Sequence, residues 1–398
     1  MTGNPSPLQD VPASAGDQLA ALAAELQGAL ANDDLSSFYD FFRSTDLPFV
    51  ATVHQGRMQP LFRCCFEILH RLGAISPAAA LAIENHYYVT SAIATVPSLD
   101  GHAAGARREL LSAIAAQRVL VANTNSKVHT NRLGAIGTHA QRHREGFRVN
   151  GTAAYMSLAT EADILVFITQ LADEGPAIFA IAPLQDNPSI EIGPYLFPTA
   201  MLASDTRRVT FHNLDLPADA LLVGPRDEHV SAFIAFEMAW HQLLIPALYL
   251  GAAAGAIQEV RRFVSETQGK DGMPLVEVDG VVVDVGRLAI EYRSACATVL
   301  QAGDRLAQVR GFPEDLDLLE SAVDDAGVAK YVGTRCAEAV VGAARRVVGP
   351  RAFTGGQRLE SLSQEVMFGP LGPESTSMIE RRHGRRALLG RTYLERWW

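Results

Sequence analysis

The spacing of hydrophobic residues divides the chain into a helical, a β-rich and a second helical zone. In the first zone, residues 17–118, leucines recur at helical spacing, as at Leu19, Leu22 and Leu26. This period predicts a helix with one apolar face. Further helices are predicted over 61–72, 77–93 and 106–117, with a proline just inside the start of the second.

The middle zone, residues 119–226, carries short runs rich in β-branched and aromatic residues. One run, 147–151, ends in Asn150-Gly151, the dipeptide that most favours a tight turn between two strands. Similar runs lie at 164–169, 177–183 and 208–214. Because these runs are short and closely spaced, they favour a small barrel or sandwich over βαβ units.

The last zone, residues 227–398, returns to helical spacing in long stretches. The predicted helices cover 231–266, 284–310 and 315–348, each long enough for a bundle. Pro246 lies inside the first and predicts either a kink or a later start. Residues 1–16 are polar and contain prolines, which predicts a flexible tail and not a signal peptide.

Composition narrows the classes of function. The 398 residues carry a formal charge of −10, which argues against sequence-independent nucleic-acid binding because that needs a basic face. We expect a soluble, cytoplasmic protein without a membrane span. Four cysteines without a C-x-x-C pair predict free thiols, and the histidines at 129, 139 and 143 lack metal-ligand spacing, so no metal site is predicted.

Four segments resemble the acyl-CoA dehydrogenase superfamily. Residues 145–157 (EGFRVNGTAAYMS) resemble its G-[YF]-x-[LIV]-N-G-x-K-x-[FW]-[IV]-[ST] pattern, and 209–223 (VTFHNLDLPADALLV) resemble V-x-F-x-[DN]-V-x-V-P-x-x-x-[LV]-L. Residues 250–257, and the stretch from Ala329 to Phe353, are similar to the family's bundle. The resemblance implies an α+β fold: an N-terminal helical domain, a central small β-barrel and a C-terminal four-helix bundle, assembled as a homotetramer or homodimer.

The resemblance also implies a flavin, FAD, with FMN as the alternative. By the match, Tyr155, Met156 and Ser157 hold the isoalloxazine ring, with the hydroxyl or backbone of Ser157 near flavin N5. A donor at N5 stabilises the charge that forms when a hydride arrives, and a flat side chain packs the ring.

Two parts of the expected flavin site depart from the family pattern. Residues 123–132 replace the family's T-E-P-x-x-G-S-D, and gapless counting puts Asn125 and Asn131 at its Thr and Ser positions. The arginine that the family places after its first bundle helix is missing, and Arg351 can supply that charge from a loop of a neighbouring subunit. The same loop contains Gly355 and Gly356.

Dehydrogenation of an acyl thioester needs a base that takes the α-proton while flavin N5 takes the hydride. Glu374 lies in the segment 372–376 that resembles the family's Y-E-G-T loop and is the first candidate. The family's other base position, on the first bundle helix, falls at His241, with Glu237 one turn earlier on the same face. The predicted function is oxidation of an acyl thioester, carried by CoA or a carrier protein, in specialised metabolism, with the electron acceptor or flavin reductase left open.

Two alternatives remain open on sequence. One branch of the superfamily resembles flavin-dependent monooxygenases, which lack the base glutamate and use reduced flavin and O₂. Its R-D-x-x-x-x-x-x-H-P pattern corresponds here to residues 364–373, with Gly372 in place of the histidine. The other alternative is a non-redox protein on the same scaffold that has lost flavin, since several family positions have changed.

Overall fold

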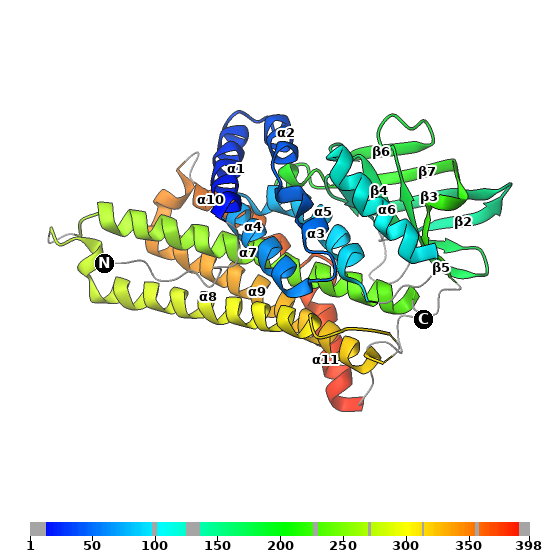
Figure 1. Cartoon of the computed structure of the whole chain (residues 1–398). Coiled ribbons are helices and arrows are strands. Elements are labelled where there is room, and N and C mark those ends of the chain that lie inside the picture. The colour runs from blue at the N-terminus through cyan, green and yellow to red at the C-terminus, as the bar shows by residue number, and fades with distance from the viewer. Residues whose placement is uncertain are drawn as a thin grey trace.

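The computed structural model describes residues 13–97, 102–124, 136–225, 230–269, 272–312, 314–354 and 358–389. Figure 1 shows three parts: a β-sheet at one end, N-terminal helices beside it, and long C-terminal helices that pass beneath the N-terminal helices and extend away from the sheet. The helical, β and helical order expected from the hydrophobic spacing is therefore confirmed. Residues 1–12 of the predicted tail and the chain end after 389 lie outside the described residues. Residues 13–16 begin the first helix, so the predicted tail extends four residues too far.

The N-terminal part is helical, as predicted. Its helices are α1 (Ala13–Ala31), α2 (Ser36–Ser44), α3 (Val50–Val53), α4 (Met58–Gly73), α5 (Pro77–Thr95) and α6 (His102–Gln117). The central one, α5, begins where the Ser76 side chain accepts a hydrogen bond from the Ala79 N–H and Pro77 occupies the first turn. Almost every residue of α5 is buried, because α4 and α7 (Val230–Glu266) pack on it.

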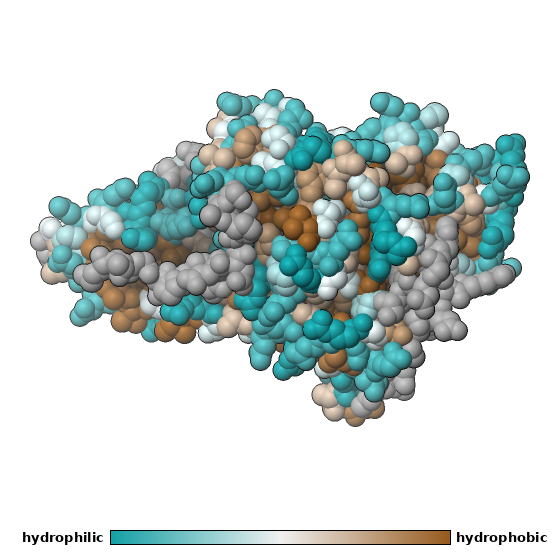
Figure 2. Space-filling view, viewed as in Figure 1, coloured by the Kyte–Doolittle hydropathy of each residue, from teal (hydrophilic) through white to brown (hydrophobic). Residues whose placement is uncertain are grey.

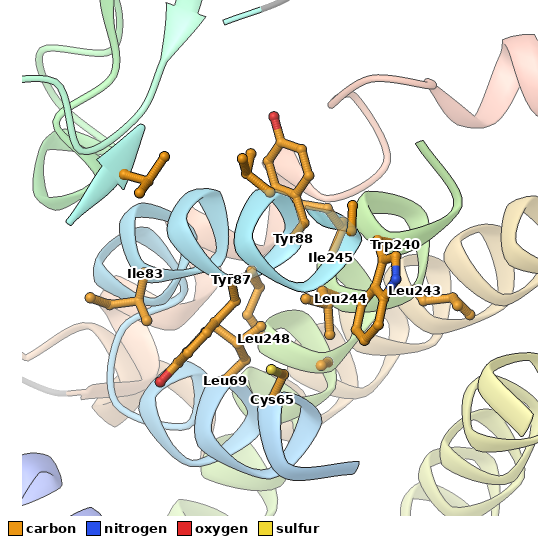
Figure 3. Close-up of a cluster of buried hydrophobic side chains, with 14 of the residues drawn as sticks. Cys65, Leu69, Ile83, Tyr87, Tyr88, Trp240, Leu243, Leu244, Ile245 and Leu248 are labelled. Carbon is orange, nitrogen blue, oxygen red and sulfur yellow. The ribbon is translucent and has the colours of Figure 1, made fainter. Parts of the chain in front are cut away.

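Side chains on α5 point into two different environments. Figure 3 shows Tyr87 directed towards Leu69 and Cys65 of α4, whereas Tyr88 points away from α4. The Tyr87 hydroxyl donates to the Leu47 carbonyl at 2.9 Å. The helix thus closes the core on one side and offers polar groups on the other.

The start of α5 is held by a buried carboxylate from α10 (Arg358–Glu365). Glu365 accepts hydrogen bonds from the Ser76 hydroxyl at 2.9 Å and from the Ala78 N–H at 2.7 Å. Burial nevertheless raises the pKa of Glu365 to about 7, and the two hydrogen bonds oppose this rise. The folded protein therefore binds this proton more tightly than the unfolded chain does.

We expect this carboxylate to make stability depend on pH. Its folded pKa is raised, so its contribution is fully present below the unfolded pKa and is lost as pH rises through about 7. Relative to wild type, the Glu365→Gln variant should gain on the order of 3 kcal/mol in free energy of unfolding between pH 4.5 and 7.5. Urea unfolding of both proteins across that range measures the difference, and a pH-independent difference would contradict the assignment.

The middle zone forms one eight-stranded sheet. The strands are β1 (Val121–Asn123), β2 (Thr138–His143), β3 (Gly146–Met156), β4 (Ile164–Leu171), β5 (Gly175–Ile181), β6 (Ile190–Tyr195), β7 (Arg207–Leu216) and β8 (Leu221–Val223). Their order is β6-β7-β3-β2-β4-β5-β8, with β1 added beside β4. All pairs are antiparallel except β1 with β4 and β2 with β4.

The prediction of a turn at Asn150-Gly151 is wrong. Strand β3 runs through both residues without a break, and the β2–β3 turn is made at Arg144 and Glu145. Gly151 instead occupies an irregular position of the strand, with φ at +115° and a register shift against β7. Pairing with strands on both sides keeps the chain extended, and the glycine relieves the bulge.

The C-terminal part contains long helices close to the predicted ranges. They are α7, α8 (Asp279–Leu306) and α9 (Leu316–Val348), followed by α10 and α11 (Thr376–Leu389). Pro246 lies inside the continuous α7, so the alternative of a later helix start is wrong. The α7 helix packs against α9, α8, α4 and α5, which makes it the centre of the molecule.

Helix α7 is also the one described helix that is long and apolar enough to cross a membrane. Its most apolar window has a mean hydropathy of 1.5, and 78% of that window is buried inside the fold. A buried core helix passes the same test, and the packing of α7 on four other helices accounts for its composition.

The close approach of α4 and α7 depends on glycine. A Cβ at Gly73 would overlap the Leu248 carbonyl, and a Cβ at Gly251 would overlap the carbonyl of His70. We expect Gly251→Ala to force the helices apart and to lower the free energy of unfolding by about 1–3 kcal/mol. Gly28→Ala is the control, since nothing lies within 4 Å of it and alanine favours the helix by up to about 1 kcal/mol. Urea unfolding of both variants measures the contrast, and equal stabilities would contradict it.

Candidate functional site

The sheet, α5 and α7 meet at the end of strand β1. The Asn123 side chain donates to Glu237 Oε1 at 3.0 Å, and its backbone N–H donates to the Asn85 side chain. The neighbouring Thr124 hydroxyl donates to the Ala154 carbonyl of β3 at 2.8 Å. These contacts fix the end of β3, where the flavin ring is expected, relative to both helices.

His241 on α7 forms a pair with Glu84 on α5. Its Nδ1 lies 3.0 Å from Glu84 Oε1, and its Nε2 lies 3.2 Å from the Pro373 carbonyl oxygen. The edge of the Tyr88 ring packs against the imidazole, with centroids 4.9 Å apart. The His241 side chain is 16% exposed, whereas that of Glu84 is fully buried. The pair thus has one face that a small molecule can reach.

The environment of the His241–Glu84 pair decides where its protons lie. Burial raises the pKa of Glu84, and its interaction with His241 opposes the rise. A carbonyl oxygen only accepts, so Nε2 must carry a proton to bond Pro373. The remaining proton then lies between Nδ1 and Glu84, on either atom. Such a pair can give up the Nε2 proton and take one back, which is general acid–base chemistry.

Tyr88 is a second polar group on this side of α5. Its pKa is raised well above the usual range by burial, with the charges of Glu237 and Glu84 adding to the effect. The phenol therefore stays protonated at neutral pH and acts as a hydrogen-bond donor or acceptor, never as a base.

The structure encloses Glu374 instead of opening it to a cleft. Its side chain is 3% exposed, and both carboxylate oxygens accept hydrogen bonds from Arg382, at 3.2 and 2.8 Å. Gln242 donates to the same carboxylate at 3.2 Å. Both carboxylate oxygens of Glu374 therefore have hydrogen-bond partners within the protein. These contacts disfavour Glu374 as the base, and its assignment stays a prediction.

A buried lysine holds the loop that carries Glu374 through hydrogen bonds to its backbone. The Lys330 ammonium donates to the backbone carbonyls of Gly369, Gly372 and Glu374. Burial lowers the pKa of Lys330 to about 8, and the charge of Glu374 opposes this shift. The same loop presents the Pro373 carbonyl to His241, so Lys330 helps to position the histidine.

Glu237 lies one turn before His241, as expected from helical spacing. It is 4% exposed and accepts the hydrogen bond from Asn123. This contact gives it a positioning role at the β1 end. A direct catalytic role for Glu237 stays a prediction.

The three residues expected to hold the flavin ring differ in exposure. Tyr155 is 45% exposed, and its ring stacks on Phe197 with centroids 6.1 Å apart. Met156 is fully buried, so its side chain has no free surface for a ring. The Ser157 hydroxyl is buried and hydrogen-bonded to Thr206 at 2.8 Å. This leaves the Tyr155 ring as the exposed group of the three, and contact of a cofactor with Ser157, which is 4% exposed, stays a prediction.

The other predicted cofactor residues are placed only in part. The Arg351 guanidinium lies 5.6 Å from the Phe263 ring centroid, at the end of α9. Asn125, Asn131, Gly355 and Gly356 lie outside the described residues. Within the described part of the chain, no group of three His, Cys, Asp or Glu side chains is arranged to hold a metal ion.

Sequence reasoning missed Glu84 and Tyr88. Both lie in a helix that reads as apolar and buried, and the partner of Glu84 is 157 residues further along the chain. One signal was present: a glutamate at the centre of an otherwise uncharged helix is costly unless it is paired.

Comparison with known proteins identifies the fold. The acyl-CoA dehydrogenase C-terminal domain family matches residues 233–388. The structure of TdsC from Paenibacillus sp. A11-2, solved with FMN and indole, superposes with a TM-score of 0.80 at 18% identity, covering 97% of this chain and 100% of that one. Butyryl-CoA dehydrogenase from Megasphaera elsdenii gives 0.78 at 13% identity, covering 98% and 100%. The chain has the acyl-CoA dehydrogenase fold.

This fold confirms the resemblance found in the sequence. In Bacillus subtilis (strain 168), a protein named "Putative acyl-CoA dehydrogenase YdbM" is 24% identical over 245 residues. That match covers 60% of this chain and 60% of the relative's length. Proteins with the acyl-CoA dehydrogenase fold thus include a butyryl-CoA dehydrogenase and a protein solved with FMN and indole.

Proposed function

We propose that the protein is a flavin-dependent oxidoreductase that oxidises an acyl thioester, with the His241–Glu84 pair as its acid–base group. The observation that carries the proposal is this pair, which lies at the junction of α5, α7 and the β1 end in an acyl-CoA dehydrogenase fold. A cytoplasmic location and a role in specialised metabolism are parts of the same proposal.

The residues at the end of β3 fit a flavin ring. Tyr155 stacks on Phe197, and Phe197 packs edge-on against Phe368 of the C-terminal part, with centroids 5.1 Å apart. The stacked rings of Tyr155 and Phe197 are nearly parallel and give a flat apolar surface against which an isoalloxazine can pack, and Phe368 supports Phe197 from the C-terminal part. Tyr155, the Ser157 backbone and Arg351 would hold the cofactor, FAD or FMN. When bound, the flavin supplies the hydride acceptor.

The protein's own residues would orient the substrate and move its proton. Tyr88 and the Pro373 carbonyl flank the imidazole of His241, so a bound thioester meets Nε2 at the exposed face of the pair. To take a proton from the substrate, Nε2 must first release its own proton to solvent, which the partly exposed imidazole can reach, and break its hydrogen bond with the Pro373 carbonyl. The pair then holds the substrate proton, with Glu84 stabilising the imidazolium.

Monooxygenation is the second candidate function. It is favoured by the enclosure of Glu374, whose carboxylate is already hydrogen-bonded to Arg382 and Gln242. It is also favoured by the fold shared with TdsC, which was solved with FMN and indole, a small molecule that is not a thioester. In this reading the proton on Nε2 is given to a developing oxygen anion, and no carboxylate base is required.

Two assays separate the candidates. The purified protein, saturated with FAD, is mixed anaerobically with butyryl-CoA and other acyl-CoA esters, and the flavin absorbance is followed. Bleaching by a thioester alone supports dehydrogenation. If no thioester bleaches the flavin, and oxygen is consumed with indole once a flavin reductase and NADH are added, the monooxygenase reading holds instead.

A homo-oligomer is also part of the proposal. Helix α8 exposes apolar side chains, among them Val282, Val283 and Ile290, which are 52%, 53% and 67% exposed. Brown surface along the long helices in Figure 2 shows apolar side chains reaching solvent there. A second copy of the chain packing on α8 would cover them.

A further inference from the structure

A cavity lies at the far end of α5, separate from the candidate site. Its volume is about 430 Å³, within the range of small-molecule sites. Its walls come from the turn before α4, the last residues of α5, the middle of α6 and the end of α8. None of the residues that line it belongs to the pair of His241 and Glu84 or to the end of β3.

The lining of this cavity is strongly basic. Arg107 and Arg108 enter from α6 and Arg310 from the segment after α8, and no aspartate or glutamate lines the cavity. Among the described residues, none of these three side chains has a carboxylate within 4.0 Å, although the Asp315 carboxylate accepts from the Arg310 backbone N–H at 2.6 Å. Arg108 and Arg310 are exposed, whereas Arg107 is half-buried, and most other half-buried arginines have such a carboxylate.

The surroundings of Arg107 show that its positive charge has no carboxylate, among the residues that the structure describes, to balance it. One of its guanidinium nitrogens donates to the Val96 carbonyl at 2.7 Å, which directs the group into the half-buried wall. Burial and, after it, the charge of Arg108 lower the pKa of Arg107. Neighbouring cations in a partly buried site repel each other unless an anion lies between them.

Hydrogen bonds join the other parts of the wall. The Thr95 hydroxyl donates to the Ser91 carbonyl at 2.7 Å and accepts from the Trp240 indole N–H at 3.1 Å. The Gly56 N–H donates to the Ala94 carbonyl at 3.0 Å, which joins the turn before α4 to the end of α5. The protein's own hydrogen bonds thus hold this part of the wall together.

We propose that this cavity binds a phosphate-bearing small molecule. Guanidinium groups bind phosphate oxygens with paired N–H donors, and three of them from two elements suit a group that carries two charges and several oxygens. The site is independent of the flavin and of the reaction proposed above.

Titration with pyrophosphate by calorimetry at low salt tests this site. The wild type should show saturable binding, and the Arg108→Gln/Arg310→Gln double variant should bind at least about tenfold more weakly. These two side chains are exposed or lie in a loop, so the variant should fold. The control is Arg381→Gln/Arg385→Gln on α11, which removes the same charge elsewhere and should bind as the wild type does.

Three results would overturn the proposal. One is no saturable binding to the wild type up to about 10 mM pyrophosphate. Another is equal affinity in both double variants, which would place the binding elsewhere or reduce it to net charge. The third is citrate binding as tightly as pyrophosphate, which would show that the site does not select phosphate.

Discussion

Replacing His241 by glutamine should lower the rate of substrate-driven flavin bleaching by about 10²–10⁴-fold while flavin stays bound. Glutamine can keep the contact with Glu84 but cannot carry the proton that the imidazole exchanges at Nε2. The histidine lies inside α7, more than two turns from its first residue, and α7 is held by packing against α9, α4, α5 and α8. The change should therefore act on the chemistry and leave the fold intact.

Two further variants make this result specific. His212→Gln changes an exposed histidine on β7, paired with Glu191, and should leave the rate unchanged. Glu84→Gln removes the carboxylate that holds the pair's second proton, so the acid limb of the pH–rate profile should move to lower pH. If Glu374→Gln abolishes bleaching and His241→Gln does not, Glu374 is the base and the assignment of the pair falls.

Replacing Arg382 by methionine should lower the free energy of unfolding by about 3–5 kcal/mol. Arg382 pairs with both Glu374 and Asp324, and the three side chains are each 10% exposed or less. Its loss leaves two buried carboxylates without their main partner, although Arg386 still contacts Asp324. For a chain of this length, the loss corresponds to a fall in Tm of roughly 5 °C.

The control for this variant is its neighbour on α11. Arg385→Met removes the same charge from an exposed position and should change the free energy of unfolding by no more than about 0.5 kcal/mol. Adding Glu374→Gln and Asp324→Asn to Arg382→Met should recover most of the lost stability, because the orphaned charges are then gone. Thermal unfolding of the four proteins measures this series, and equal Tm values for Arg382→Met and Arg385→Met would contradict the account.

Helix positions were predictable because their cause is local. The apolar period that marks 231–266 and 315–348 is the same period that packs α7 on α9, so the ends agree to within a residue. The turn predicted at Asn150-Gly151 does not form, because contacts distant in the sequence override the local preference. Its preference for a turn is local, but pairing with β2 and β7 on either side keeps the strand extended.

The candidate site was predictable only where one residue carried its own signal. His241 and Glu237 stand on the helix face that the family pattern points to, and both reach the site. The partner that defines the function of His241 comes from another helix, and spacing along the chain cannot reveal it. Likewise, nothing next to Glu374 in the chain shows that Arg382 and Gln242 enclose it.

The most direct test of the account is the visible absorption spectrum of the purified full-length protein, before and after FAD or FMN is added and the excess removed. The account predicts a flavin band with close to one flavin per chain, and a clear loss of that band in Tyr155→Ala. Absence of any retained flavin from the wild type, with either cofactor, would contradict the central claim that this fold serves flavin chemistry here.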